Sequence, residues 1–132
     1  VHHPAESKPY CGAGWSVSAA RTGHTRDSVG YRFDVEGRSV VISGDATDHP
    51  DLVELARGAD MVVLECSYPD QLGIPGHLTP ASAGRLATEA GARHLVLTHF
   101  YPVCRMDEIA SQANRAFAGR LTLAYDGLVL EV

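Results

Sequence analysis

Three short, continuously apolar runs recur along the chain and alternate with helical patterns. The runs are Val40–Ile42, Met61–Leu64 and Leu95–Leu97. Strands that are apolar on both sides are typical of a sheet that is covered by the helices connecting its strands. The pattern therefore predicts an α/β fold. Because 132 residues are enough for one domain with a real core, we expect residues 1–132 to form a single unit.

The segments between the apolar runs have the periodicity of amphipathic helices. Pro50 is placed to begin the first of them. The second has the clearest ends, with Thr79 as N-cap, Pro80 at the first helical position and Gly91 just past the end. A third helical pattern stops at Gly119.

The outer parts of the chain have the patterns of further strands. Apolar and polar residues alternate over residues 15–19 and 31–35, and each segment predicts a half-buried strand. We expect the apolar side of the second, with Tyr31 and Phe33, to belong to the core. Near the end, an Asp-Gly pair at 126–127 separates two apolar runs and predicts a β-hairpin. The expected order is therefore ββββαβαβαββ.

Composition and charge limit the classes of function. The formal charge is −5, and we see neither a basic stripe nor a stacking cluster of aromatic residues, which argues against a nucleic-acid-binding protein without chemistry. No apolar run approaches the roughly 20 residues of a membrane span, so we expect no membrane contact and a cytoplasmic location. Residues 1–12 lack periodicity and predict an irregular lead-in, in which we expect His2 and His3 to be incidental.

Residues with metal-binding chemistry follow the predicted strands. Asp45, Glu65 and His99 come within three residues after the three apolar runs. His24 follows an alternating segment, and His77 precedes the capped helix. Because ligands in such sheets bind where the strands end, we expect these five side chains to lie at one edge. Imidazole together with carboxylate is the ligand set of zinc or a similar divalent metal.

Each of these residues also has a structural explanation. Asp45 is compatible with a turn, and Glu65 with a hydrogen-bond acceptor at a strand end. His24, His77 and His99 are each compatible with an ordinary loop or strand-end histidine. Their common placement after strands and before a helix favours a metal site more than any one residue does.

Four stretches, in this order, resemble a known family. They are TGHTRDSVGYRFDVEGRSVVISGDATD, ADMVVLECSYPD, GHLTPASAGRLATEAG and ARHLVLTHFYP. They are similar to the C-terminal half of the metallo-β-lactamase superfamily, nearest its ribonuclease Z and phosphodiesterase-like branch, over about residues 13–132. The resemblance implies one half of an αββα fold, a mixed β-sheet with helices on one face.

The resemblance also implies roles for the five residues. His24 resembles a ligand of a first metal, His99 a ligand of a second, and Asp45 the carboxylate that bridges both. His77 resembles the histidine that meets the scissile phosphate and assists the leaving group, and Glu65 the residue that orients it. The implied cofactors are two divalent ions, zinc or manganese, which activate a hydroxide for phosphodiester hydrolysis. The implied substrate is a small phosphodiester or an RNA.

The chain departs from the family in one respect. The H-x-H-x-D-H motif, which supplies two ligands to each metal, does not occur in these 132 residues. Two protein ligands per ion would remain, fewer than the three usual for catalytic zinc. We therefore expect a fragment, a truncated form or one chain of a two-chain enzyme.

The missing half has a consequence for association. A half of this fold would expose an apolar sheet face, and we expect that face to bind an N-terminal half or a second copy of the chain. The alternative function is a non-catalytic, self-associating half-domain that binds metal weakly or not at all.

Overall fold

The fold is built on one seven-stranded sheet in which each strand lies beside its neighbours in the sequence. The computed structural model describes residue 5 and residues 8–132, so His2 and His3 lie outside the described residues. The strands, in chain order, are β1 (Tyr10–Gly12), β2 (Trp15–Arg21), β3 (Val29–Val35), β4 (Arg38–Ile42), β5 (Met61–Glu65), β6 (His94–Thr98) and β7 (Arg120–Leu123).

The sheet is mixed, as the family resemblance implies. Strands β1 to β4 pair antiparallel, whereas β4 to β7 pair parallel. Because β2 and β4 are both antiparallel to β3, β2 also runs in the direction of the parallel strands. The carboxyl ends of β2, β4, β5 and β6 therefore lie at the same edge of the sheet, which we call the metal edge.

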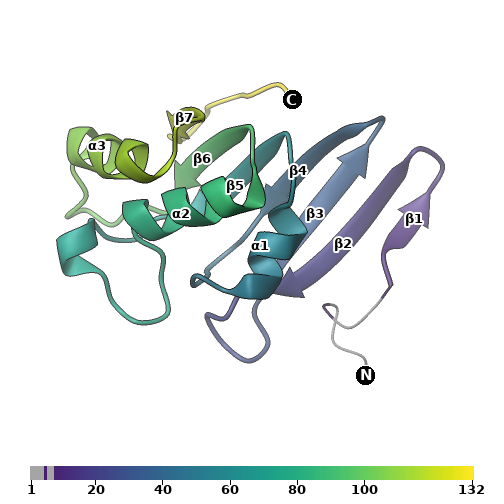
Figure 1. The fold of residues 1–132 in the computed structure, drawn as a ribbon, viewed down its shortest axis with the longest axis horizontal. Coiled ribbons are helices and arrows are strands. Elements are labelled where there is room, and N and C mark those ends of the chain that lie inside the picture. The colour runs from purple at the N-terminus through teal and green to yellow at the C-terminus, as the bar shows by residue number, and fades with distance from the viewer. Residues whose placement is uncertain (1–4, 6–7) are drawn as a thin grey trace.

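Three helices cover one face of this sheet (Figure 1). They are α1 (Pro50–Ala56), α2 (Pro80–Ala90) and α3 (Met106–Ala116), with a short 3₁₀ turn, η2 (Asp70–Leu72), before α2. The predicted ends of α2 are confirmed, because the Thr79 side chain accepts from the Ser82 amide and Gly91 is left-handed. His49, which the sequence does not mark, caps α1 by accepting from the Asp51 amide.

The hydrophobic core lies between the sheet and the three helices. Its largest fully buried apolar side chains are Val41, Leu52, Val62, Leu64, Leu78, Leu86, Leu95, Leu97 and Ile109. Helices α2 and α3 approach closely at Gly84, where an added Cβ would lie 2.8 Å from the Cβ of Ala116. The predicted α/β fold with helices on one face is confirmed.

No helix of the described residues covers the opposite face of the sheet, and this corrects the expectation for β3. Tyr31 and Phe33 are 39% and 38% exposed rather than buried in the core. Their polar neighbour Arg32 points the other way and donates to the carbonyls of Leu55 and Arg57 at the end of α1. The residues of β3 therefore alternate as predicted. Its polar side chains point toward the helices, and its apolar side chains point to the opposite face.

We call the side of the sheet that carries no helix the open face. Trp15 pairs with Val35, and Tyr31 with Ile42, so these side chains stand on the same side as Phe33. Val35 and Ile42 are 50% and 45% exposed. The open face therefore carries large apolar side chains from at least three adjacent strands.

Both chain ends differ from the prediction. The irregular lead-in is shorter than residues 1–12, because Tyr10–Gly12 form β1 against β2. All residues of β1 are exposed. Its sequence therefore lacks the alternation of apolar and polar residues that predicts a half-buried strand. The Asp-Gly pair at 126–127 does form a turn, but no strand follows among residues 128–132. Instead, Glu131 and Val132 line a cavity with Arg120 and the first residue of β4, at the edge opposite the metal edge.

The described part of the chain contains no helix with the length and hydropathy that a membrane crossing requires.

Candidate metal centre

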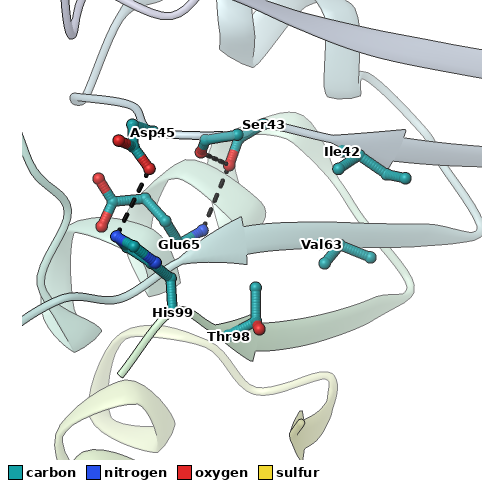
Figure 2. Close-up of a pocket in the computed structure, with 8 residues that line it drawn as sticks. Ile42, Ser43, Asp45, Val63, Glu65, Thr98 and His99 are labelled. Atoms are coloured by element: carbon teal, nitrogen blue, oxygen red, sulfur yellow. Dashed lines mark hydrogen bonds and ion pairs between the residues drawn. The ribbon is translucent and has the colours of Figure 1, made fainter. Parts of the chain in front are cut away.

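All five predicted site residues lie at the metal edge. His24 follows β2, Asp45 follows β4, Glu65 is the last residue of β5, and His99 directly follows β6. His77 lies in the loop between η2 and α2. Figure 2 shows the side chains of Asp45, Glu65 and His99 converging from the ends of their strands. The common placement expected from the sequence is thus present, whereas the role of each residue stays a prediction.

Asp45 lies between two histidines. Its Oδ2 is 3.7 Å from Nε2 of His24, and its Oδ1 is 3.5 Å from Nε2 of His99. Two atoms that bind one zinc ion at 2.0–2.2 Å each are at most about 4.4 Å apart, so each oxygen–nitrogen pair is close enough to share an ion. The carboxylate of Asp45 thus offers one oxygen to each histidine.

His77 also lies within reach of this group. Donor atoms of His24, Asp45 and His77 all lie within 4.8 Å of one another. The rings of His24 and His77 have centroids 4.8 Å apart, and those of His77 and His99 are 6.2 Å apart. Three imidazoles and one carboxylate form a donor set that suits zinc or another divalent transition metal.

The position of His24 is determined by its neighbours in two loops. Its Nδ1 bonds to the carbonyl oxygen of Gly76 at 2.6 Å, which leaves Nε2 directed at Asp45. The preceding Gly23 has φ +75°, and a Cβ there would lie 2.3 Å from Oγ1 of Thr47. A side chain at residue 23 would therefore displace the loop that presents His24.

Thr22 is a site residue that the sequence does not reveal. It is fully buried, and its Oγ1 donates to the carbonyl of Asp45 at 2.7 Å. Its own carbonyl accepts from the amide of Thr47 at 2.8 Å. Thr22 thus joins the loop that carries His24 to the loop that carries Asp45. A threonine at the end of a strand gives no signal of such a role.

Glu65 is buried and is fully occupied by hydrogen bonds. It is 2% exposed and accepts from Nδ1 of His77 at 2.7 Å. It also accepts from the amide of Ala46 and from both the amide and the hydroxyl of Ser67. Because a carboxylate accepts, it holds the proton on Nδ1 of His77 and leaves Nε2 of that ring for the site.

The two residues after Glu65 have different environments. The hydroxyl of Ser67 is 3.1 Å from Nδ1 of His77, so Ser67 supports the same histidine, although the sequence does not single it out. Cys66 is fully buried. Burial, together with the nearby Cys104 and Glu65, raises the pKa of the Cys66 thiol. The thiol therefore stays protonated and does not serve as a thiolate ligand.

His99 has an unusual backbone conformation. Its φ is +62°, in the left-handed region that side chains other than glycine, asparagine, aspartate and histidine adopt less readily. This conformation turns the chain directly after β6. The imidazole of His99 then lies beside Asp45.

Two tyrosines beside the site correct the expectation that the chain has no stacking aromatic cluster. Tyr68 and Tyr101 stack, with ring centroids 4.8 Å apart and 19° between the ring planes. Tyr101 also meets His99 edge-on at 5.7 Å. The tyrosines are 33 residues apart in the sequence. Their one shared signal is that each follows a strand end and precedes a proline.

The metal edge is continuous with the open face. One cavity is lined by Ile42 and Val63 of the sheet together with Asp45, Glu65 and His99 (Figure 2). Whatever covers the open face at the end of β4 and β5 would therefore also form a wall of the site.

The family is decided by a comparison with protein-family models. Residues 8–100 match the model described as the beta-lactamase superfamily domain, which is more than half of the chain. The chain belongs to the beta-lactamase superfamily. Proteins similar to it include an uncharacterised protein of Mycobacterium tuberculosis, 36% identical over 122 residues, which cover 90% of this chain and 45% of that protein. A ribonuclease Z of Kineococcus radiotolerans is 45% identical over 94 residues, covering 62% of this chain and 29% of that enzyme.

A solved structure of the same superfamily supports the fold. The metallo-beta-lactamase fold protein YhfI from Bacillus subtilis matches with a TM-score of 0.84 and 25% identity, over 92% of this chain and 51% of that one. The chain thus spans about half the length of these similar proteins. The family resemblance seen in the sequence is confirmed.

Proposed function

We propose that the protein containing this chain is a metal-dependent phosphodiester hydrolase, and that this chain supplies part of a site for two divalent ions. The observation that carries the proposal is the position of Asp45, whose two oxygens face two different histidines at 3.7 and 3.5 Å. A carboxylate between two imidazoles is suited to bridge a pair of ions. Membership of the superfamily, and a ribonuclease Z among its similar members, support hydrolytic chemistry.

The donors fit a pair of zinc ions, with manganese as the alternative. His24 and Asp45 would hold one ion, and Asp45 and His99 the other. When bound, such a pair activates water near neutral pH and offsets the charge of a phosphate group. His77 is placed to serve either as a further ligand or, as the family resemblance implies, as the residue that meets the substrate.

In the second role, His77 would transfer a proton. Its Nδ1 is held by the buried carboxylate of Glu65, so the proton available to a substrate is the one on Nε2. From Nε2 the ring would give its proton to the oxygen of the leaving group. Ser67 keeps Glu65 in place by donating its hydroxyl at 2.7 Å.

The site needs further ligands, and the open face indicates where they come from. His24, Asp45 and His99 give each ion two protein ligands, where catalytic zinc usually has three. Similar proteins are about twice as long as this chain. We propose that a complementary half packs on the open face and completes the metal edge from the side of Ile42 and Val63.

The test is made on the complete protein loaded with zinc or manganese. Asp45→Asn and His99→Asn are expected to lower hydrolysis of bis(p-nitrophenyl) phosphate by at least about 100-fold, the upper end of what residues supporting a metal ligand cost. Bound metal, measured by mass spectrometry, is expected to fall in parallel. Asparagine suits position 99 because it accepts a left-handed backbone.

The matched control is His94→Gln, which removes an imidazole at the opposite end of β6. It is expected to keep activity and metal content. If Asp45→Asn and His99→Asn retain full activity while circular dichroism shows them folded, the proposed function is wrong.

The non-catalytic half-domain is the second candidate, because the open face is exposed and the chain by itself gives only two ligands to each ion. Metal analysis of isolated residues 1–132 tests whether the chain by itself binds metal weakly, as the non-catalytic half-domain would. Two tightly held ions per chain would contradict a non-catalytic role for the isolated chain.

A further inference from the structure

The stacked tyrosines form a rigid aromatic wall beside the metal edge. Tyr68 follows the end of β5, and Tyr101 follows the end of β6. The amide of Tyr101 donates to the carbonyl of Ser67 at 3.3 Å, and the carbonyl of Tyr101 accepts from the amide of Cys104 at 2.9 Å. The first bond joins the two loops beside the stacked rings, and the second closes a turn within the loop that carries Tyr101.

The wall contacts two of the site residues. The ring of Tyr101 lies 5.7 Å from that of His99 at 84°, and the ring of Tyr68 lies 6.5 Å from that of His77 at 69°. A group bound between Asp45 and these histidines would thus have an aromatic surface at its side.

Part of the wall remains open to solvent. Tyr101 is 41% exposed, although its ring is fixed by one stacking and one edge contact. A tyrosine that served only to fill the core would be buried, as Ile109 and Phe117 on the neighbouring helix α3 and its end are. An exposed ring held in one orientation is suited to bind another flat ring by offset stacking or edge contact.

We infer that this wall binds the base of a nucleotide whose phosphate lies at His24, Asp45 and His99. The inference rests on the proposed function, because it assigns the class of phosphodiester that the site accepts. Nucleobases are flat rings that stack on aromatic side chains whatever their sequence. The formal charge of −5 disfavours a long polyanion, so a mononucleotide or dinucleotide is a better match than an extended RNA.

The test compares two ligands that differ in the base alone. Adenosine 5′-monophosphate and ribose 5-phosphate are titrated calorimetrically into the complete, metal-loaded protein. The base is expected to tighten binding by about 5- to 140-fold, the range that stacking of one base gives. Tyr101→Ala is expected to remove most of this preference and to leave binding of ribose 5-phosphate unchanged.

Two further variants separate stacking from a structural role. Tyr101→Phe keeps the ring and is expected to keep the preference for the nucleotide. Tyr10→Ala removes an exposed tyrosine on β1 and is expected to change neither ligand. A Tyr101→Ala protein that loses both ligands equally, or neither, would overturn the inference.

The outcome also separates this inference from the proposed function. Hydrolysis of bis(p-nitrophenyl) phosphate together with equal binding of the two ligands by the unsubstituted protein would reject the nucleotide wall and leave the hydrolase standing. A preference for the nucleotide that depends on Tyr101, without phosphodiester hydrolysis, would support the wall and reject the hydrolase.

Discussion

Glu65 shows how much of the site depends on one buried residue. Its carboxylate receives four hydrogen bonds, from His77, Ala46 and two groups of Ser67. In Glu65→Gln, one oxygen becomes an amide that donates, so at least one of these buried donors loses its acceptor. We expect the free energy of unfolding to fall by about 1–3 kcal/mol. Urea denaturation measures the change.

The control for this prediction is Glu54→Gln. Glu54 is an exposed residue of α1 whose partner is Arg57 on the same surface. An exposed ion pair contributes little, so Glu54→Gln is expected to unfold at nearly the same urea concentration as the unsubstituted protein. Equal stability of the Glu65→Gln and Glu54→Gln proteins would show that the buried network does not stabilise the fold.

At this scale, the sequence predicts the residues that combine a distinctive chemistry with a distinctive position. Asp45, Glu65 and His99 lie at or just after the ends of apolar strands, and that placement brings them together. Thr22 and Ser67 are equally part of the arrangement. A hydroxyl can donate and accept in many settings, so its presence in a sequence does not predict a site role. Their partners are backbone atoms and side chains brought near by folding, which no local pattern encodes.

At the scale of the elements, β6 runs from His94, at the end of the sheet away from the metal edge, to Thr98, and His99 follows it at the metal edge. His94 is nearly buried, and its Nε2 bonds with Oγ1 of Thr122 in β7 at 2.8 Å. Burial, and to a smaller extent the charge of Arg120, lowers the pKa of His94 below its ordinary value of 6.5. The strand therefore carries a neutral histidine that resists protonation in the folded state.

This pKa predicts how stability depends on pH. Below pH 6.5 the unfolded chain takes up a proton at His94 before the folded protein does, so the folded state loses stability as the pH falls. His94→Gln is expected to show a smaller loss than the unsubstituted protein when urea midpoints are measured between about pH 8 and pH 5.

The matched control, Thr122→Val, removes the hydrogen bond but keeps the titrating group. It is expected to shift the urea midpoint by a similar amount at every pH and to retain most of the pH slope. If His94→Gln shows the same slope as the unsubstituted protein, the acid sensitivity has another origin.

The elements themselves could be predicted where periodicity and end signals agree. The cap at Thr79 and the stop at Gly91 define α2 because both act locally on the backbone. The failures are β1 and the closing hairpin, at the two ends of the chain. Pairing of an edge strand depends on a neighbour distant in space, so neither the exposed β1 nor the unpaired residues 128–132 follow from local pattern.

At the scale of the whole molecule, the metal edge and the open face meet. Ile42 and Val63 belong to the open face and also line the cavity at Asp45 and His99. A sheet with helices on one side and exposed apolar residues on the other leaves apolar surface on which a further layer could pack. The sequence predicts which residues alternate on β3, but the choice of covered face depends on how α1 packs.

The open face makes a prediction for residues 1–132 in isolation. Tyr31, Phe33, Val35 and Ile42 are 38–50% exposed, and a contiguous exposed apolar patch of this kind favours association. We therefore expect the isolated chain to form dimers or larger species at micromolar concentrations, measured by sedimentation velocity. Phe33→Lys places a charge in the middle of the open face and is expected to shift the chain toward monomer.

Val129→Lys is the control for this shift, because Val129 is 85% exposed but lies in the tail after β7 rather than on a strand of the open face. It is expected to leave the association unchanged, since association depends on where the apolar surface lies and not on its total amount. A single monomeric species for the unsubstituted chain would reject self-association. An equal shift in both variants would show that the open face is not the contact surface. If Phe33→Lys alone dissociates the chain, the open face is the surface through which the copies associate.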